Sequence, residues 1–570
     1  MPPAVSALAS RFPFVDGLSR QSALRGGLIA LPHIVALTIL LATEDDIVSQ
    51  AAFALAWGLL NCFWLLLFRR PGFAGAVSLA MIVLLILLSQ LKHSVLFMTV
   101  NFVDLMIIDW DTIGFLLTVM PTLSRNVLIA ALITLPAAVA IWWLDPLRVR
   151  RCIAALGFVA CLVALTALSF AVPNGSEAEF IGSRYVSKFA RSGVTAVGDY
   201  LVRGIFESDS EIVEHLKVGV GGTSCNPAQK PPHIVMVFDE SSFDATNMPG
   251  TKVPADYREH FASFDGKNRA FVVEGAGGPS WFTEYNVLTG LSVRSYGRFA
   301  DFVTRIAAGR VERGLPWALR RCGYKTYTFY SFLGAFLSAR RFQETAGIEN
   351  FHDAKVLGAT GVDPDGFFYD AATRVIAQNK NKQPLFLFVY TLANHFPWSY
   401  RFRPDLTPDW QGYGNAPETD EYLRRQMLSR RDYRSFMAKL RKDYPDESFL
   451  VVRFGDHLPG LAMQHIEPGL DVRGITQHVK ARDPRYFTTY YAIDAVNFKP
   501  VDMSSALPRL DAPYLPIVVM EAAGLPLDAS FAEQKRIMDR CYGQFYQCAA
   551  GAEVRRFNRM LIEAGLIKGL

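Results

Sequence analysis

The sequence predicts a membrane anchor of five helices followed by an α/β domain outside the membrane. Three observations carry this prediction. Hydrophobic residues make up 51% of the 570 residues and charged residues only 19%, which is more apolar than soluble proteins usually are. The stretches long enough to cross a bilayer lie in the first third of the chain. From residue 233 onward, short apolar runs alternate with helical patterns, which is typical of a sheet that helices cover on both faces.

Five apolar stretches approach the ~20 residues that a hydrocarbon core requires. They are residues 26–43, 51–68, 73–91, 126–144 and 153–172. The first stretch is not predicted to be a cleaved signal peptide, because further spans follow it and no small-residue cleavage site stands out. Together these stretches predict a membrane domain over residues 26–172.

The positions of the arginines predict how these spans are oriented, because cytoplasmic connections are rich in Lys and Arg. Arginines precede the first span, follow the second, and lie between the fourth and fifth: Arg11, Arg20, Arg25, Arg69, Arg70, Arg148, Arg150 and Arg151. The other connections are acidic or mixed. Alternation then places residues 1–25 in the cytoplasm and everything after residue 172 on the outer side, which for a bacterial inner membrane is the periplasm.

The connection formed by residues 92–125 is apolar but contains Asp104, Asp109 and Asp111. It is predicted to be an interfacial helix that lies on the membrane, because a sixth span would return the C-terminal domain to the cytoplasm. The net charge is only +5, and the chain has no basic helix and no zinc-finger spacing. Nucleic-acid binding is therefore not expected.

The outer part of the chain is predicted to consist of a linker over residues 173–232 and a catalytic domain over residues 233–570. Five short apolar runs in the domain are predicted to be strands: residues 233–238, 270–274, 325–330, 385–390 and 449–454. In a parallel α/β sheet, ligands bind at the carboxyl ends of the strands. The residues that follow each run are therefore the candidates for a functional site.

Four of these runs are followed by residues that can bind a metal or a phosphate. Glu240 follows the first run, Ser280 opens a helix after a glycine-rich turn, His395 follows the fourth run, and Asp456 and His457 follow the fifth. Each residue alone has an ordinary interpretation, such as a loop carboxylate, a helix cap or the end of a strand. Their joint occurrence at one edge of one sheet favours a functional site.

The chemistry of this set is that of a phosphoryl-transfer site. Two carboxylates, an imidazole and a serine oxygen can form a tetrahedral site for a divalent cation. A serine bound to that cation is partly ionised and becomes a nucleophile, and the positive end of the helix behind Ser280 attracts a phosphate. His395 is not needed as a ligand and can bind the phosphate or protonate a leaving alkoxide.

The motifs "IVMVFDESSFD", "GGPSWFTEYNVLTGL", "NHFPW" and "RFGDHLPGL", in this order, resemble the alkaline-phosphatase superfamily. The branch they resemble contains the lipoteichoic acid synthase-like and periplasmic-glucan phosphoglycerol transferases. The resemblance covers about residues 233–500 and implies a mostly parallel central sheet flanked by helices. It also implies that Glu240, Ser280, Asp456 and His457 hold the metal and that His395 contacts the substrate phosphate.

The sequence departs from this branch at two places. The nucleophile of the branch is usually threonine, where this chain has Ser280. The synthases also carry a histidine, an aspartate and an arginine after the "GY" strand, and only Arg340 or Arg341 matches in this chain. Arg340, Arg341 and Trp398 complete the predicted substrate contacts alongside His395. The glutamate four residues after the nucleophile is present as Glu284 and is expected to give structural support.

The resemblance implies a phosphoglycerol transferase. This enzyme would take phosphoglycerol from phosphatidylglycerol onto Ser280 and pass it to a glycan, with Mn²⁺ as the expected cation and Mg²⁺ or Zn²⁺ as alternatives. A phosphoethanolamine transferase is the second hypothesis, although His457 is followed by Leu-Pro rather than by the "GES" of that branch. A sulfatase is disfavoured, because its nucleophile is followed by a proline two residues later and an arginine four residues later. This chain has Phe282 and Glu284 at those two positions. A tethered, non-catalytic binding protein is the third hypothesis and predicts decayed ligands.

Four of the seven cysteines lie in the predicted outer part: Cys225, Cys322, Cys541 and Cys548. An even number of cysteines in an oxidising compartment permits disulfides. Cys541 and Cys548 are close in sequence and are the preferred pair, while buried free thiols remain the alternative. Two possible pairs and no cell-wall anchoring motif favour a Gram-negative inner membrane.

Overall fold

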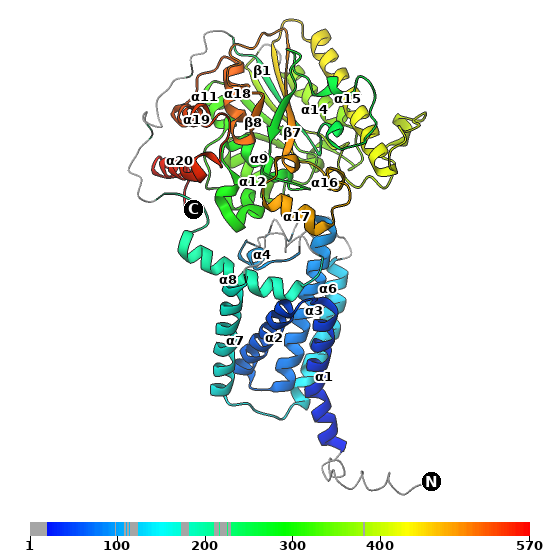
Figure 1. Ribbon diagram of the computed structural model, residues 1–570, viewed down its shortest axis with the longest axis vertical. Helices are drawn as coiled ribbons and strands as arrows, with labels where there is room; N and C mark the ends of the chain where they lie inside the picture. Colours follow the sequence, from blue (N-terminus) through cyan, green and yellow to red (C-terminus); the bar gives the residue numbers. More distant parts are fainter. Residues whose placement is uncertain are drawn as a thin grey trace. The chain divides into compact units, whose positions relative to one another are not determined.

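A computed structural model of the chain (Figure 1) describes residues 20–96, 99–107, 110, 113, 123–172, 182–209, 216, 225, 230–379 and 382–569. This described part forms two compact units. Residues 20–107 and 123–202 belong to the first unit, and residues from 203 onward, together with Trp110 and Ile113, belong to the second.

The first unit is helical. Its helices are α1 (Arg20–Thr43), α2 (Ile47–Phe68), α3 (Pro71–Leu96), α4 (Phe102–Ile107), α6 (Leu123–Leu144), α7 (Arg151–Ala171) and α8 (Tyr185–Arg203). Helix α2 packs against α3 and α7, and α3 packs against α1 and α6. Large apolar side chains nevertheless point outward, such as Leu84 and Leu156, which are 56% and 73% exposed. Such surfaces are suited to lipid rather than to water.

Among the described residues, three helices are long and apolar enough to cross a membrane: α2, the part of α3 at Pro71–His93, and α7. Helices α1 and α6 cover the other two predicted spans. In α1, however, the apolar described stretch is Ile29–Thr43, which is shorter than a span. The five-helix anchor therefore stays a prediction. Of the predicted interfacial helix, the described residues include α4, and much of its remainder lies outside them.

The second unit contains one mixed sheet of eight strands in the order β4-β3-β5-β1-β6-β7-β2-β8. The strands are β1 (His233–Asp239), β2 (Arg269–Val272), β3 (Lys325–Phe329), β4 (Asn350–His352), β5 (Leu385–Tyr390), β6 (Phe449–Gly455), β7 (Thr488–Val496) and β8 (Arg509–Asp511). All five predicted strands are present. Only β7 runs antiparallel to its neighbours, so β2 points in the same direction as β1, β5 and β6.

The register of the two central strands brings two predicted ligands together. Strands β1 and β6 are parallel, and Asp239 is paired with Gly455 at their carboxyl ends. Both strands are buried along their whole length, which explains their continuous apolar sequence. The next residues along each strand, Glu240 and Asp456, therefore leave the sheet side by side.

Helices cover both faces of this sheet (Figure 1). They are α9 (Ser280–Thr289), α10 (Val303–Ala307), α11 (Leu315–Arg321), α12 (Ala339–Thr345), α13 (Ala354–Leu357), α14 (Asp365–Gln378), α15 (Pro417–Asp443), α16 (Gly460–His465), α17 (Val472–Lys480), α18 (Leu515–Ala522), α19 (Ala529–Arg540) and α20 (Ala552–Glu563). One core lies between the sheet and α14 and α15, with Val235, Leu387, Phe368 and Phe436 among its buried residues. Helix α11 packs against β3 and α9 on the opposite face.

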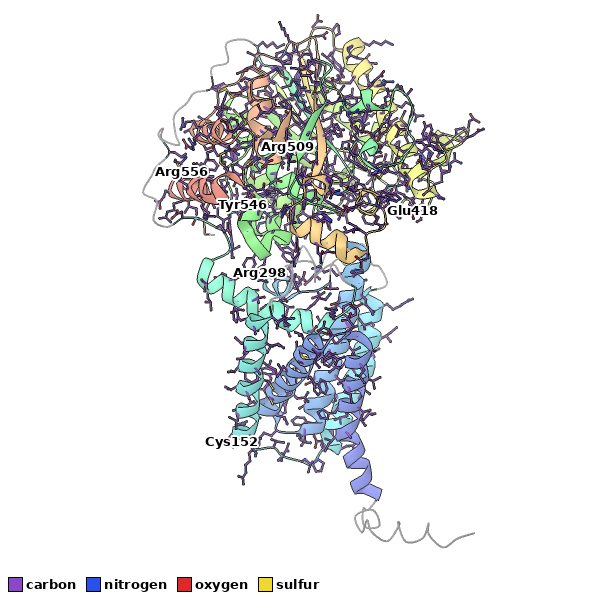
Figure 2. The ribbon with its side chains drawn as sticks, viewed as in Figure 1. Cys152, Arg298, Glu418, Arg509, Tyr546 and Arg556 are labelled. Carbon is purple, nitrogen blue, oxygen red and sulfur yellow. A yellow bond between two sulfur atoms is a disulfide. The ribbon has the colours of Figure 1, made fainter. Side chains whose placement is uncertain are left out.

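Two disulfides link parts of the second unit: Cys225–Cys322 and Cys541–Cys548. The second is the pair that sequence proximity favoured, so that prediction is confirmed. Ion pairs also hold the C-terminal helices: Arg556 of α20, labelled in Figure 2, lies 2.9 Å from Glu533 of α19. The free cysteines among the described residues, such as Cys152, all lie in the first unit.

Candidate active site

Glu240, Asp456 and His457 form a buried cluster at the carboxyl ends of β1 and β6. A carboxylate oxygen of each acid and a ring nitrogen of the histidine all lie within 4.8 Å of one another. The exposed fraction of each residue is at most 2%. The structure thus brings together three of the four metal ligands that the sequence predicted.

Ser280, the fourth predicted ligand, points into this cluster. Its Oγ donates to Glu240 at 3.1 Å and 3.3 Å and lies 3.2 Å from Nε2 of His457. Ser280 is the first residue of α9, and the residue before it, Pro279, makes no side-chain cap. The hydroxyl is therefore directed to the cluster, which argues against the interpretation of Ser280 as a simple helix cap.

The glycine-rich turn before α9 is joined directly to the loop that carries His457. The N–H of Gly277 donates to the carbonyl of Leu458 at 2.9 Å. Gly277 has a φ of 83°, a left-handed conformation that glycine adopts at little cost. This contact explains how Ser280 reaches ligands from β1 and β6, although β7 separates β2 from β6 in the sheet.

Gly455 of the "GDH" motif allows the ends of β1 and β6 to approach closely. A Cβ atom placed on Gly455 would lie 1.8 Å from the carbonyl oxygen of Ser242. No other residue type fits there without movement of the backbone. The glycine is therefore part of the construction that places Asp456 and His457 beside the loop after β1.

Ser241 holds two of the ligands and was not predicted from the sequence. Its N–H donates to Oδ1 of Asp456 at 2.7 Å, and its Oγ donates to Glu240 at 3.0 Å. Its φ is 53°, and its carbonyl accepts a hydrogen bond of 2.8 Å from Tyr422 of α15. Non-glycine residues in this conformation are typical of functional sites, but no local sequence signal marks them.

Two buried carboxyl groups lie close together in the cluster, and this shifts the pKa values of its members. Burial, reinforced by the charge of Glu240, raises the pKa of Asp456 to about 8. Burial disfavours the charged form of His457, but Asp456 and Glu240 outweigh it and raise that pKa to about 9. Burial also disfavours ionised Glu240, yet its hydrogen bond with His457 and the charge of His395 lower its pKa.

These residues fit a divalent cation. Oδ2 of Asp456 is buried and has no hydrogen-bond partner among the described residues, although it lies 3.2 Å from Nε2 of His457. Nδ1 of His457 donates to the carbonyl of Leu458 at 3.1 Å, so Nε2 is the ring nitrogen that faces the cluster and would bind a cation after losing its proton. Two carboxylates, an imidazole and a hydroxyl are suitable ligands for Mn²⁺, Mg²⁺ or Zn²⁺.

His395 lies beside the cluster, on the loop after β5. Its charge is one of the causes that lower the pKa of Glu240. Its ring centroid is 5.2 Å from that of Phe332, and its Nδ1 donates to the carbonyl of Phe396 at 2.7 Å. Trp398 follows on the same loop, where its Nε1 donates to the carbonyl of Asn394 at 3.0 Å. Both side chains are half-buried and thus accessible to a substrate.

The two predicted arginines lie at the start of α12. The guanidinium of Arg340 bonds to Asp353 at 2.9 Å and to the carbonyl of Phe351 at 3.0 Å. These bonds join it to β4 and the residue after that strand. Arg341 lies in the first turn of α12, and its carbonyl accepts a hydrogen bond from Thr345. Roles for either arginine in substrate binding stay predictions.

Glu284 lies inside the fold beneath Ser280. It is 1% exposed and accepts a 2.8 Å hydrogen bond from Gln343 of α12. Burial raises its pKa to about 7, while hydrogen bonds with Tyr390 and Gln343 act in the opposite direction. These contacts link α9 to α12 and β5, in agreement with the expected supporting role.

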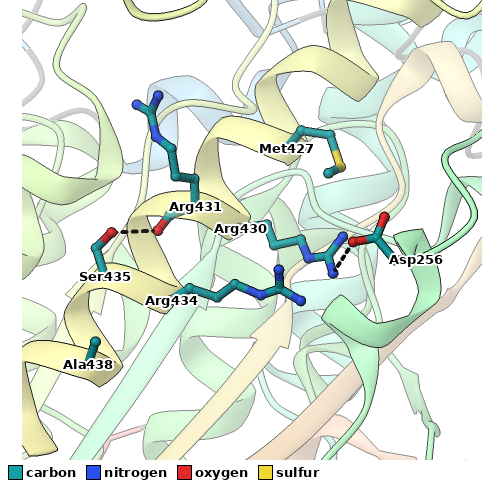
Figure 3. A pocket seen from close by; sticks show the side chains of 7 residues that line it. All are labelled: Asp256, Met427, Arg430, Arg431, Arg434, Ser435 and Ala438. Carbon is teal, nitrogen blue, oxygen red and sulfur yellow. Dashed lines mark hydrogen bonds and ion pairs between the residues drawn. The ribbon is translucent and has the colours of Figure 1, made fainter.

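A separate pocket of about 370 Å³ lies along α15, and among the described residues it is lined by none of the predicted site residues. Figure 3 shows Arg430 and Arg434 extending toward the side where Asp256 lies, while Arg431 extends away. Arg430 pairs with Asp256 at 2.9 Å and with Glu259 at 3.1 Å. The guanidinium of Arg430 is thus paired with carboxylates, and the pocket is separate from the cluster of Glu240, Asp456 and His457.

Comparison with known families gives a match over part of the chain. Residues 278–479 match the family model described as Sulfatase. This segment includes Ser280, His395, Asp456 and His457, and it begins after Glu240. The match confirms the predicted resemblance to the alkaline-phosphatase superfamily and supports the prediction of an enzyme.

The chain is also similar, at low sequence identity, to several solved structures. The phosphoglycerol transferase GacH of Streptococcus pyogenes, in complex with sn-glycerol-1-phosphate, is 13% identical over 60% of this chain and 91% of its own, with a TM-score of 0.46. The integral membrane protein EptA of Neisseria meningitidis is a lipooligosaccharide phosphoethanolamine transferase. It is 14% identical over 87% of this chain and 95% of its own, with a TM-score of 0.44. The lipoteichoic acid synthase LtaP of Listeria monocytogenes is 19% identical over 58% and 79%, with a TM-score of 0.38. Among curated protein sequences, none matches this chain.

Proposed function

We propose, from the premise that residues 278–479 belong to a sulfatase-type domain, that the protein is a membrane-anchored phosphoglycerol transferase. It would move phosphoglycerol from phosphatidylglycerol through a covalent intermediate on Ser280 to a hydroxyl of a glycan. The observation that carries the proposal is the position of Ser280 Oγ, 3.1 Å from Glu240 and 3.2 Å from His457 at the start of α9. A hydroxyl in that position can attack a phosphorus held at the helix N-terminus.

The location proposed for this chemistry is the periplasmic side of a bacterial inner membrane. Residues 1–25 would be cytoplasmic, residues 26–172 would form the anchor, residues 173–232 the linker and residues 233–570 the catalytic domain. The arginine pattern supports this orientation. The disulfides Cys225–Cys322 and Cys541–Cys548 support an oxidising compartment for the second unit.

In the first step, Ser280 Oγ attacks the phosphorus of the lipid. The bond from Oγ to phosphorus forms, and the bond from phosphorus to the glycerol oxygen of diacylglycerol breaks. The proton of Ser280 passes to solvent, and His395 donates a proton to the departing oxygen. A divalent cation held by Glu240, Asp456, His457 and Ser280 would supply positive charge that favours ionised serine and polarises a phosphoryl oxygen.

In the second step, a glycan hydroxyl replaces Ser280 at phosphorus. The acceptor oxygen bonds to phosphorus, its proton passes to His395, and the bond to Oγ breaks. Ser280 then regains a proton from solvent, which restores the starting state. Ser241 would hold Asp456 and Glu240 in place through both steps, because its hydrogen bonds to them do not involve the substrate.

Release of diacylglycerol tests this proposal. Full-length protein in detergent, supplied with Mn²⁺ and labelled phosphatidylglycerol, is expected to release labelled diacylglycerol and to carry a phosphoglycerol adduct on Ser280. A protein that binds Mn²⁺ but never cleaves the lipid would contradict the proposal and would favour a tethered binding protein.

A phosphoethanolamine transferase is the second candidate. It is favoured by one observation: the histidine and aspartate that the resemblance expects after β3 have no match in the segment that follows β3 in this chain. The two candidates share every step above and differ only in the group carried on Ser280. The mass of the Ser280 adduct, formed from an equal mixture of phosphatidylglycerol and phosphatidylethanolamine, distinguishes them.

A further inference from the structure

The segment after β3 is unusually apolar for its position. Residues 332–337 read Phe-Leu-Gly-Ala-Phe-Leu, so no side chain in this segment can donate or accept a hydrogen bond. Apart from the buried Gly334, these residues are half-buried and keep part of their surface accessible. We call residues 332–337 the apolar segment.

The apolar segment borders the reacting groups on two sides. Phe336 packs edge-on against Trp281, the residue directly after Ser280, with 6.0 Å between ring centroids. Phe332 packs against His395 at 5.2 Å. The apolar segment therefore contacts both the neighbour of the nucleophile and the histidine that donates a proton to the departing oxygen.

Specific contacts fix the conformation of the apolar segment. The N–H of Gly334 donates to Asp353 at 3.1 Å, and the same carboxylate pairs with Arg340 at 2.9 Å. Thr304 donates to the carbonyl of Leu337 at 2.8 Å. Leu337 and Ser338 have φ values of 46° and 57°, an unfavourable conformation for two consecutive residues with side chains. A conformation that is costly and held by partners on both sides is typical of a functional position.

We propose that the apolar segment binds the diacylglycerol part of the donor lipid, which is the leaving group of the first step. This inference rests on the proposed function. In the proposed first step the leaving oxygen takes its proton from His395, and Phe332 lies against that ring, so the departing alcohol would lie beside the apolar segment. The acceptor gives its proton to the same ring in the second step, so it would approach this side only after diacylglycerol has left. Diacylglycerol is apolar and gains from contact with these side chains. A glycerol head group or a sugar would lose water there without gaining hydrogen bonds.

The test compares a lipid with its deacylated counterpart. Wild type and Phe336→Ser, both full-length, receive either dioleoyl phosphatidylglycerol or glycerophosphoglycerol, and kcat/KM is measured for each. Because the variant loses the apolar contact of the phenyl ring with the acyl part of the lipid, Phe336→Ser is expected to lower kcat/KM for the lipid about tenfold or more. Its kcat/KM for glycerophosphoglycerol should change little, and Phe336→Leu should retain most of the lipid activity.

A matched control is Phe264→Ser. The ring of Phe264 is 48% exposed and precedes β2, at the end of that strand opposite the turn to Ser280. This variant should behave like wild type with both substrates. Thermal unfolding and Mn²⁺ content confirm that each variant is folded and loaded.

Three results would overturn the inference while leaving the proposed function intact. An equal loss for both substrates would indicate a general effect on the site. A changed preference between phosphatidylglycerol and phosphatidylethanolamine would place the head group on the apolar segment. Unchanged lipid cleavage with reduced transfer to an oligosaccharide would place the acceptor there. By contrast, if the wild-type protein cleaves neither lipid, the proposed function itself is wrong.

Discussion

A Cβ atom on Gly455 would lie 1.8 Å from the carbonyl oxygen of Ser242, so the ends of β1 and β6 meet at a distance that only glycine permits. Gly455→Ala should force these segments apart and displace Asp456 from Ser241. We expect a loss of about 2 kcal/mol or more in the free energy of unfolding, together with weaker Mn²⁺ binding. Gly460→Ala is the control, because a Cβ there meets no atom within 4 Å. Equal stability of the two variants in urea unfolding would contradict this explanation of the motif.

Substitutions at Ser280 separate a nucleophile from a helix cap. A cap is worth ~1 kcal/mol of stability, so Ser280→Ala would leave activity intact if capping were its role. As a nucleophile, its removal should leave folding unchanged and reduce diacylglycerol release by several orders of magnitude. Ser280→Thr should retain measurable activity, and Ser280→Cys should be poor with Mg²⁺, which prefers oxygen ligands. An active alanine variant would exclude the covalent intermediate.

Asp456→Asn should weaken metal binding. The substitution keeps the size of the side chain but removes the carboxyl group that would ionise when a cation binds in this buried cluster. We expect the affinity for Mn²⁺ to fall at least tenfold, measured by calorimetry on metal-stripped protein. Asp405→Asn, which changes an exposed carboxylate paired with Arg403, should bind Mn²⁺ like wild type. Full metal content in Asp456→Asn after dialysis would argue that the cation lies elsewhere.

The buried carboxyl of Glu284 should make stability depend on pH. Its pKa is raised from 4.5 to about 7, so the folded state binds more protons than the unfolded state between these values. The free energy of unfolding should therefore fall as pH rises from about 4.5 to 7, by on the order of 3 kcal/mol from this group. Glu284→Gln keeps the hydrogen-bonding shape without the titration, and its stability curve should be flatter over that range. Parallel curves for the two proteins would show that Glu284 does not carry the effect.

The strands and the ligand cluster were predictable because their signals are local. Most of the predicted strands are continuous apolar runs, and Glu240, Asp456 and His457 follow closely after two of them. Ser280 is marked instead by the glycine-rich turn that precedes its helix. Strand β7 lacks such a signal, because "TTYYAIDAV" mixes threonines and an aspartate with apolar residues. The observed sheet is mostly parallel, as predicted, and β7, which the sequence did not reveal, is its antiparallel strand, between β6 and β2.

Contacts between distant residues could not be predicted in the same way. Ser241 is one of two serines in "DESSFD", and only the folded backbone shows which of them bonds to Asp456. Arg340 was a candidate substrate ligand by its type and position. Its pairing with Asp353 depends on how β4 returns beside β3, which no short motif encodes.

The hydrogen bond between Ser241 and Asp456 joins residues 215 positions apart in the chain. The two central strands on which these residues depend are β1 and β6, so a chain that ends before β6 has half of the ligands and no place for the cation. Contacts of such long range form late and slowly. A cation held by these residues, as proposed above, could be bound only after synthesis has passed residue 457. Metal supply would then limit the yield of active protein without limiting the yield of folded sheet.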